Sequence, residues 1–178
     1  WENHLSTQKV EENLCAFKVG IVNDFIKDKN VQSIIEIGCG DGNRSLNMNI
    51  NRYWGFDKDP VAVHLAKSVH GQREGFDFSV LTDEIMIQGD LVVSFDVFET
   101  MPEIEFDSYV KSLESATTKY AFLFQSGHAH NLKQIVAKLH GWKVIKSFNK
   151  VLYGKISVTY IVLKNEKNNE CKLSRKNI

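Results

Sequence analysis

The 178-residue sequence has little cysteine and no long apolar run, and each shortage excludes a class of protein. Its three cysteines, Cys15, Cys39 and Cys171, form no Cys-x-x-Cys pair, so we expect neither a zinc site nor a disulfide framework. No stretch approaches about 18 apolar residues, and no apolar segment opens the chain, so we expect neither a membrane span nor a secretion signal. These absences favour the reducing cytoplasm. The sequence opens at Trp1 and not at a methionine, which leaves its true start open.

Charge is balanced overall, with 22 basic and 22 acidic residues, but it is unevenly spread. Residues 74–114 contain eleven acids and one base, whereas residues 131–163 contain six lysines and no acid. Such runs are typical of solvated helix faces and strand edges. An alternative is that residues 131–163 form a basic surface that attracts an anionic substrate or, with less support, a nucleic acid.

One segment of the sequence is especially informative, residues 33–43, with the letters SIIEIGCGDGN. An apolar run carrying Glu36 is followed by three glycines at alternate positions from Gly38 onward, which predicts a buried strand that turns sharply into a loop. Such a loop brings backbone N–H groups against a ligand. Nineteen residues after Gly38, a second predicted strand ends in Asp57, which is then placed to accept hydrogen bonds from ribose hydroxyls. The chain is therefore predicted to bind a nucleoside-containing cofactor.

The glycine spacing indicates which cofactor. Dinucleotide-binding loops follow G-x-G-x-x-G, whereas the pattern here is G-x-G-x-G with Asp41 inside it. A negative Asp41 would repel a pyrophosphate, but a zwitterionic amino acid tolerates it. A nicotinamide-dependent oxidoreductase is therefore a disfavoured alternative.

The segment E-I-G-C-G-D-G-N resembles motif I of the class I S-adenosylmethionine-dependent methyltransferases. The resemblance continues through residues 55–60 (GFDKDP) and through residues 90–99 (DLVVSFDVFE), which resemble that family's fourth strand and motif. It implies an α/β fold: a single doubly wound, mostly parallel seven-stranded sheet with an antiparallel last strand. It also implies S-adenosyl-L-methionine as the cofactor.

Hydrophobic periodicity predicts alternating elements that agree with this fold. Strands are predicted at residues 33–37, 53–57, 76–80, 90–95, 120–125, 142–148 and 157–163, and helices at 8–28, from 44, 60–69, 104–115 and 131–139. The connection between the last two strands is too short for a crossover helix, so these strands should be antiparallel. We divide the chain into an N-terminal helical lid segment (1–30), a methyltransferase domain (31–164) and a polar tail (165–178).

The resemblance assigns roles to individual residues. It implies that the glycine loop wraps the amino-acid half of the cofactor, that Glu36 helps to position the ammonium group and that Asp57 binds the ribose. Where relatives carry an acid for the adenine amino group, this chain offers Ser79, Thr82 or Asp83. The full set of implied cofactor-binding residues is Glu36, Gly38, Cys39, Gly40, Gly42, Asp57, Lys58, Ser79 and Asp96.

Methyl transfer from a sulfonium is an in-line displacement, so a base is needed only when the acceptor carries a proton. Thr100 stands where many small-molecule relatives have histidine, so a base at that point does not carry over. The catalytic candidates are Asp96, Glu99, His128 and His130, all at predicted strand ends or in the loops beyond them. No metal is expected.

We predict a methyltransferase whose acceptor is a small molecule with a hydroxyl, carboxylate or amine group. Two alternatives stay open: a methyltransferase acting on a protein or nucleic acid, and a cofactor-binding module without catalysis. The absence of an Asn-Pro-Pro-Tyr or Asp-Pro-Pro-Tyr signature argues against methylation of nucleobase amino groups. The sequence does not indicate the oligomeric state.

Overall fold

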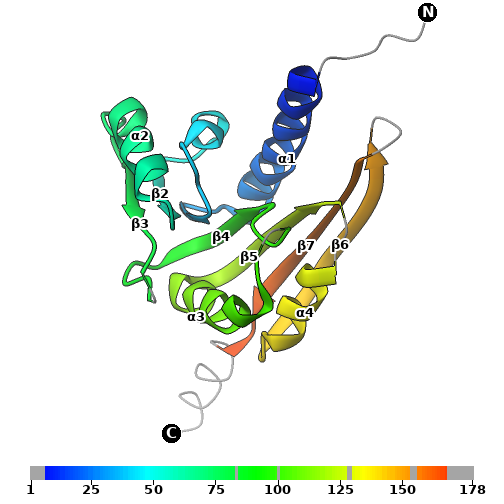
Figure 1. Ribbon diagram of the computed structural model, residues 1–178. Helices are drawn as coiled ribbons and strands as arrows, with labels where there is room; N and C mark the ends of the chain where they lie inside the picture. The colour runs from blue at the N-terminus through cyan, green and yellow to red at the C-terminus, as the bar shows by residue number, and fades with distance from the viewer. Residues whose placement is uncertain (1–6, 83, 100, 128–129, 153–155, 168–178) are drawn as a thin grey trace, which may run out of the picture.

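Seven strands form one sheet with helices packed on both of its faces (Figure 1). The computed structural model describes residues 7–82, 84–99, 101–127, 130–152 and 156–167. The strands, in chain order, are β1 (Ser33–Ile37), β2 (Arg52–Asp57), β3 (Phe76–Val80), β4 (Gly89–Phe95), β5 (Thr117–Ser126), β6 (Trp142–Leu152) and β7 (Ile156–Asn165). Each predicted strand is present, and β1 and β3 have the predicted bounds.

The strand order is β3-β2-β1-β4-β5-β7-β6. Strands β1 to β5 pair in parallel, and β7 runs antiparallel to both β5 and β6. The predicted fold class is therefore confirmed, including the antiparallel last strand. Because the chain leaves β1 for β2 and β3 on one side and returns to β4 on the other, a crevice opens at the carboxyl ends of β1 and β4.

The helices divide between the two faces of the sheet (Figure 1). One face carries α1 (Thr7–Lys29), the 3-10 helix η1 (Asn43–Asn47) and α2 (Pro60–His70). The other face carries the 3-10 helix η2 (Glu103–Glu105), α3 (Phe106–Ala116) and α4 (His130–Lys138). Successive strand side chains point to opposite faces, so Ile34 joins the first apolar core and Ile35 the second.

Helix α1 packs firmly against the sheet. Val22 and Ile26 are buried in the core, and the ring of Phe25 meets that of Tyr120 edge-on with 5.2 Å between centroids. The role of residues 1–30 as a lid stays a prediction, and residues 1–6 lie outside the described part. None of the helices in the described ranges combines the length and the apolar character needed to cross a membrane.

Two predicted helices differ from the structure in kind or extent. The helix expected from Arg44 is the 3-10 helix η1, which follows Gly42 in the left-handed conformation (φ 78°). Three asparagines in residues 43–49 explain this short turn, because Asn competes with the helix for backbone hydrogen bonds. The helix expected at residues 104–115 is split into η2 and α3.

Candidate functional site

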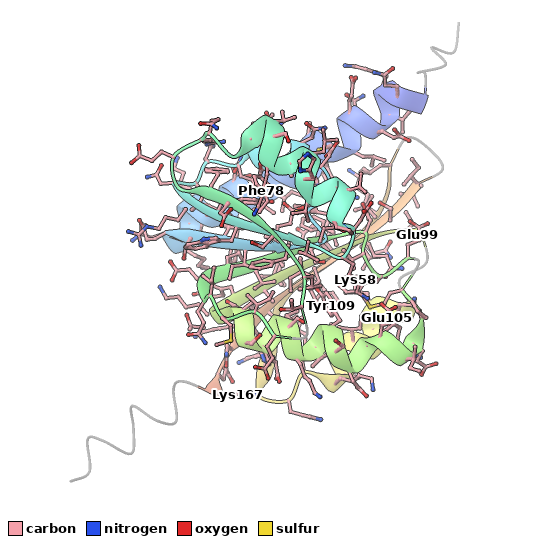
Figure 2. The ribbon with its side chains drawn as sticks, turned by 60° about the vertical axis from the view of Figure 1, so that its left-hand side comes forward. Lys58, Phe78, Glu99, Glu105, Tyr109 and Lys167 are labelled. Atoms are coloured by element: carbon pink, nitrogen blue, oxygen red, sulfur yellow. The ribbon has the colours of Figure 1, made fainter. Side chains whose placement is uncertain are left out.

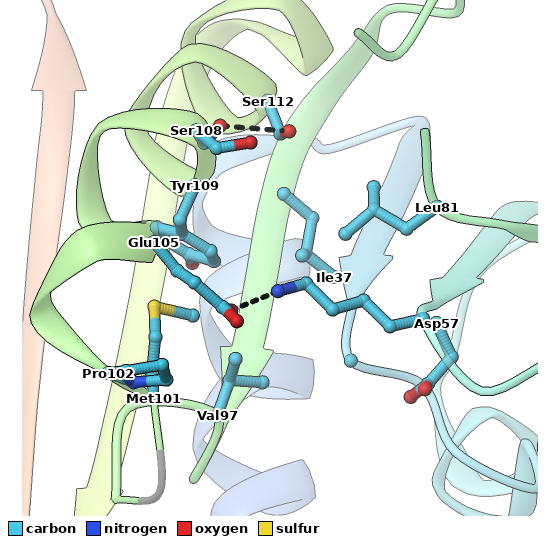
Figure 3. Close-up of a pocket in the computed structure, with 12 residues that line it drawn as sticks. Ile37, Asp57, Leu81, Val97, Met101, Pro102, Glu105, Ser108, Tyr109 and Ser112 are labelled. Atoms are coloured by element: carbon cyan, nitrogen blue, oxygen red, sulfur yellow. Dashed lines mark hydrogen bonds and ion pairs between the residues drawn. The ribbon is translucent and has the colours of Figure 1, made fainter. Parts of the chain in front are cut away.

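A cavity of about 340 Å³ opens at the carboxyl ends of the strands, between the tip of β2 and the start of α3 (Figure 3). Its walls come from β1, β2, the segments after β3 and β4, η2 and α3. The lining residues are Ile37, Gly38, Asp57, Lys58, Leu81, Val97, Met101, Pro102, Glu105, Ser108, Tyr109 and Ser112. The cavity lies at the crevice that the strand order predicts for a ligand.

The glycine loop follows β1 directly. Gly38, Gly40 and Gly42 all have positive φ, a conformation that L side chains rarely adopt. A Cβ on Gly38 would lie 2.2 Å from Cγ2 of Val97, so the loops after β1 and β4 can touch only because this residue is glycine. At Gly40, by contrast, an added Cβ would meet nothing within 4 Å, so this part of the loop borders open space.

Asp57 is fixed against the glycine loop. Its Oδ2 accepts a hydrogen bond from the backbone N–H of Gly40 (2.8 Å), and its Oδ1 accepts one from the N–H of Asp59 (2.9 Å). Each carboxylate oxygen has two lone pairs, so each keeps one for a further donor. The carboxylate at the cavity is therefore oriented and still able to accept two hydroxyl hydrogen bonds.

Glu36 has no exposed surface, and its carboxylate is held by two side chains. Arg44 Nε donates to Oε1 at 3.0 Å, and the hydroxyl of Tyr53 donates to Oε2 at 2.6 Å. Burial alone would lower the pKa of Arg44, but Glu36 more than offsets this, so the pKa is raised. Burial, and then Glu36, raise the pKa of Tyr53. Arg44 also donates to the carbonyl oxygen of Gly38 (3.0 Å), so the cluster supports the glycine loop from beneath.

Cys39 offers the loop its backbone and not its thiol. Its side chain is buried, and a Cβ on Gly55 would lie 2.9 Å from Cys39 Cβ and Sγ. Burial raises the pKa of the thiol, and the carboxylates of Glu36 and Asp57 raise it further. The thiol is therefore protonated and inert at neutral pH.

Lys58 and Glu105 form an ion pair across the cavity mouth, as the dashed line in Figure 3 shows. Lys58 follows Asp57 at the end of β2, whereas Glu105 ends η2 on the opposite wall. Nothing in the sequence linked Glu105 to the site, because the two residues are 47 positions apart.

Asp96, directly after β4, adopts a left-handed backbone (φ 61°) and joins three elements. Its Oδ1 accepts from the N–H of Ser126 (2.7 Å), and its Oδ2 pairs with the ammonium of Lys18 from α1. Lys18 also donates to the hydroxyl of Ser126 (3.0 Å), and its side chain is only 5% exposed. Sequence reasoning missed Lys18, although its place one helical turn after Leu14 on the apolar stripe of α1 is an available signal.

Among the remaining catalytic candidates, the structure describes the side chain of Glu99 alone. Glu99 is exposed, and its Oε1 lies 3.6 Å from where a Cβ on Gly127 would be. Figure 2 shows Glu99 on the same side of the molecule as Lys58 and Glu105. His128 lies outside the described residues, and of His130 only its place at the start of α4 is described.

Comparisons with known proteins bear on the fold. No protein-family model matches the chain, and no curated protein matches it. Solved structures do match. The magnesium protoporphyrin IX methyltransferase of Synechocystis PCC 6803, with bound S-adenosylmethionine, gives a TM-score of 0.70 at 14% identity, over 93% of this chain and 86% of that one.

Two further structures agree with this match. The N-methyltransferase NodS from Bradyrhizobium japonicum WM9 gives a TM-score of 0.70 at 10% identity, over 92% of this chain and 100% of that one. The methyltransferase domain of bacterial CtHen1-C gives a TM-score of 0.66 at 14% identity, over 83% of this chain and 96% of that one. This chain has the class I methyltransferase fold.

Within this fold the adenine side of the cavity departs from the prediction. Ser79, expected near the adenine, is half-buried on β3 beside Phe56 and is not one of the lining residues, whereas Leu81 is. The neighbouring Asp83 lies outside the described residues. In the ranges that the structure describes, no three His, Cys, Asp or Glu side chains gather as a metal site requires.

Proposed function

We propose that this protein is an S-adenosyl-L-methionine-dependent methyltransferase that acts on a small-molecule acceptor. The observation that carries the proposal is the anchored Asp57 carboxylate, which faces a glycine loop and a cavity at the point where the strand order reverses. A carboxylate held in this way accepts two ribose hydroxyls in charge-assisted hydrogen bonds. The three fold relatives described above are all methyltransferases by name.

The residues present fit this cofactor. The open space beside Gly40 leaves room for a ligand to approach the backbone, and a larger residue there would occupy that room. The apolar cavity walls beyond Asp57 suit a flat base, as ligand sites of mostly apolar lining do. When bound, the cofactor supplies a methyl group on a sulfonium, whose transfer leaves a neutral thioether.

The chain itself then has two tasks, to orient the acceptor and to take up a proton where the acceptor carries one. Asp96 is already held by Lys18 and Ser126, so we assign it to orientation of the acceptor near the ends of β4 and β5. Glu99 is exposed beside the loop after β5, and we assign proton acceptance to it. His130, the first residue of α4, and His128, which lies outside the described residues, are the alternative proton acceptors.

A small acceptor accords better with the placement of the lysines than a nucleic acid does. Lys143, Lys146 and Lys150 are exposed on β6, the outermost strand, with β7 and β5 between it and β4. Within the described part of the chain, the cavity walls carry one basic side chain, that of Lys58, which is paired with Glu105. The two carboxylates on these walls, Asp57 and Glu105, do not favour a phosphate backbone.

Calorimetric titration with S-adenosylhomocysteine, beside NAD, tests the proposal. We expect binding of S-adenosylhomocysteine alone, and we expect Asp57→Ala to weaken it at least tenfold because two charge-assisted hydrogen bonds are lost. Glu74→Ala is the matched control, since this exposed acid precedes the amino end of β3, whereas the cavity lies at the carboxyl ends of the strands. Failure of the wild-type protein to bind S-adenosylhomocysteine, or a preference for NAD, would refute the proposed cofactor.

A further inference from the structure

We propose that Glu105 binds the exocyclic amino group of adenine, so that η2 and not the end of β3 provides the acid that identifies the base. This inference rests on the function proposed above and deepens it. It also concerns a residue that neither the motifs nor the spacing of the sequence points to.

Among the described residues that line the cavity, only Asp57 and Glu105 carry carboxylates, and they stand on opposite walls (Figure 3). Asp57 is fixed beside the glycine loop and is assigned to the ribose. Glu105 is then the carboxylate left for a donor on the part of the ligand beyond the ribose.

The space between these two acids is bounded mainly by apolar side chains. Its walls are formed by apolar side chains from both halves of the sheet, among them Ile37, Leu81 and Val97. A purine has apolar faces and a polar edge, so it fits such a slot when its edge meets polar groups at the rim. The hydroxyl of Ser112 donates to the carbonyl oxygen of Ser108 (3.1 Å), and a neutral hydroxyl is a weaker acceptor than the charged carboxylate of Glu105.

The ion pair with Lys58 directs the Glu105 side chain across the mouth, where the side chain of Glu105 is 38% exposed and that of Lys58 is 59% exposed. The bond to Lys58 is made by Oε2, and a carboxylate has about four lone-pair positions, so acceptor capacity is left for an amino group. A 6-oxo group in the same place would set an oxygen against the carboxylate, which is unfavourable. Glu105 therefore favours adenine over hypoxanthine.

The experiment compares S-adenosylhomocysteine with S-inosylhomocysteine, in which a carbonyl replaces the amino group. Calorimetry on the wild-type protein should show a preference for the adenine compound of at least about tenfold, as expected for a hydrogen bond to a charged group. Glu105→Gln should abolish most of this preference, because an amide offers a donor as well as an acceptor. Glu103→Gln, on the same exposed turn, should leave the preference unchanged.

Lys58→Met tests which member of the ion pair, the lysine or the glutamate, determines the preference for adenine. A lysine at the mouth donates and would favour the oxo compound, so its removal should maintain or increase the preference for adenine. An unchanged preference in Glu105→Gln, or a preference lost in Lys58→Met instead, would overturn the inference while S-adenosylhomocysteine still binds. Failure of the wild type to bind S-adenosylhomocysteine at all would refute the proposed function, and this inference with it.

Discussion

Glu36 is a carboxylate without exposed surface, held by Arg44 and Tyr53 from two different elements. Removing one partner of a buried ion pair leaves the other charge without compensation, and this costs more than the pair itself contributes. Arg44→Met should therefore lower the free energy of unfolding by about 3 kcal/mol, as measured by urea denaturation. The matched control is Arg52→Met on the exposed side of β2, which should change stability by less than about 0.5 kcal/mol.

The double variant Glu36→Gln with Arg44→Met distinguishes a buried charge from lost packing. It should recover part of the stability that Arg44→Met loses, because no charge then stays buried without a partner. If the double variant is as unstable as the sum of the two single variants, the cost instead lies in the packing of Arg44, whose guanidinium lies 5.3 Å from the centre of the Phe95 ring.

The candidate site residues that could be predicted from the sequence are those with a characteristic spacing along the chain. Asp57 and the three glycines have such spacing, and in the structure Asp57 is hydrogen-bonded to the glycine loop. Lys18 and Glu105 are different, because each reaches its partner only after distant elements have packed. The spacing of residues along the chain does not predict these contacts, which are seen only in the folded structure.

Asp90 links three strands at their amino ends, opposite the site. Its Oδ2 accepts from the N–H of Gln32 before β1 (2.8 Å), and its Oδ1 pairs with Lys119 of β5 (2.8 Å). Burial would raise the pKa of this carboxyl, but these hydrogen bonds and the lysine outweigh burial and lower it. A carboxyl with a lowered pKa stabilises the folded state when it is ionised.

The sign of the pH dependence follows from that lowered pKa. The contribution of Asp90 is present above its ordinary pKa of about 4 and is lost as the pH falls through the lowered value. Asp90→Asn should therefore be less stable than the wild type at pH 7, with the difference shrinking toward zero near pH 2. Urea denaturation across this range measures the difference, with Glu74→Gln as an exposed control. A difference that stays constant with pH would show that the Asp90 charge is not the cause.

The elements themselves were largely predictable because their signals are local. Apolar residues at alternate positions of β3 and the apolar run Leu91–Val93 in β4 indicate strand type and position. The predicted bounds of β6 and β7 were too short, because the missed ends, such as residues 149–152 (NKVL), lack a regular alternation of apolar residues and are strands through their pairing. The kind of turn at η1 was also missed, because 3-10 and α-helical turns share their first residues and differ only in how they end.

On one side the sheet ends in β6, an eleven-residue edge strand whose residues are mostly exposed. Such an edge offers unpaired backbone groups to a second chain, and Val144, Ile145 and Val151 on it are also exposed. Lysines on an edge strand oppose edge-to-edge pairing, and β6 carries Lys143, Lys146 and Lys150. We therefore interpret the basic part of the sequence as protection of this edge.

The triple variant K143Q/K146Q/K150Q tests that interpretation. It should self-associate increasingly with concentration, because the edge loses its charge repulsion while its apolar side chains and free backbone groups stay exposed. Light scattering after size-exclusion chromatography measures the association, and K9Q/K27Q/K67Q removes the same charge from exposed helix positions as the control. Equal association of both variants would assign the effect to net charge and not to the edge. If only the β6 variant associates and its affinity for S-adenosylhomocysteine is unchanged, the edge strand that limits self-association is distinct from the proposed cofactor site at the carboxyl ends of the strands.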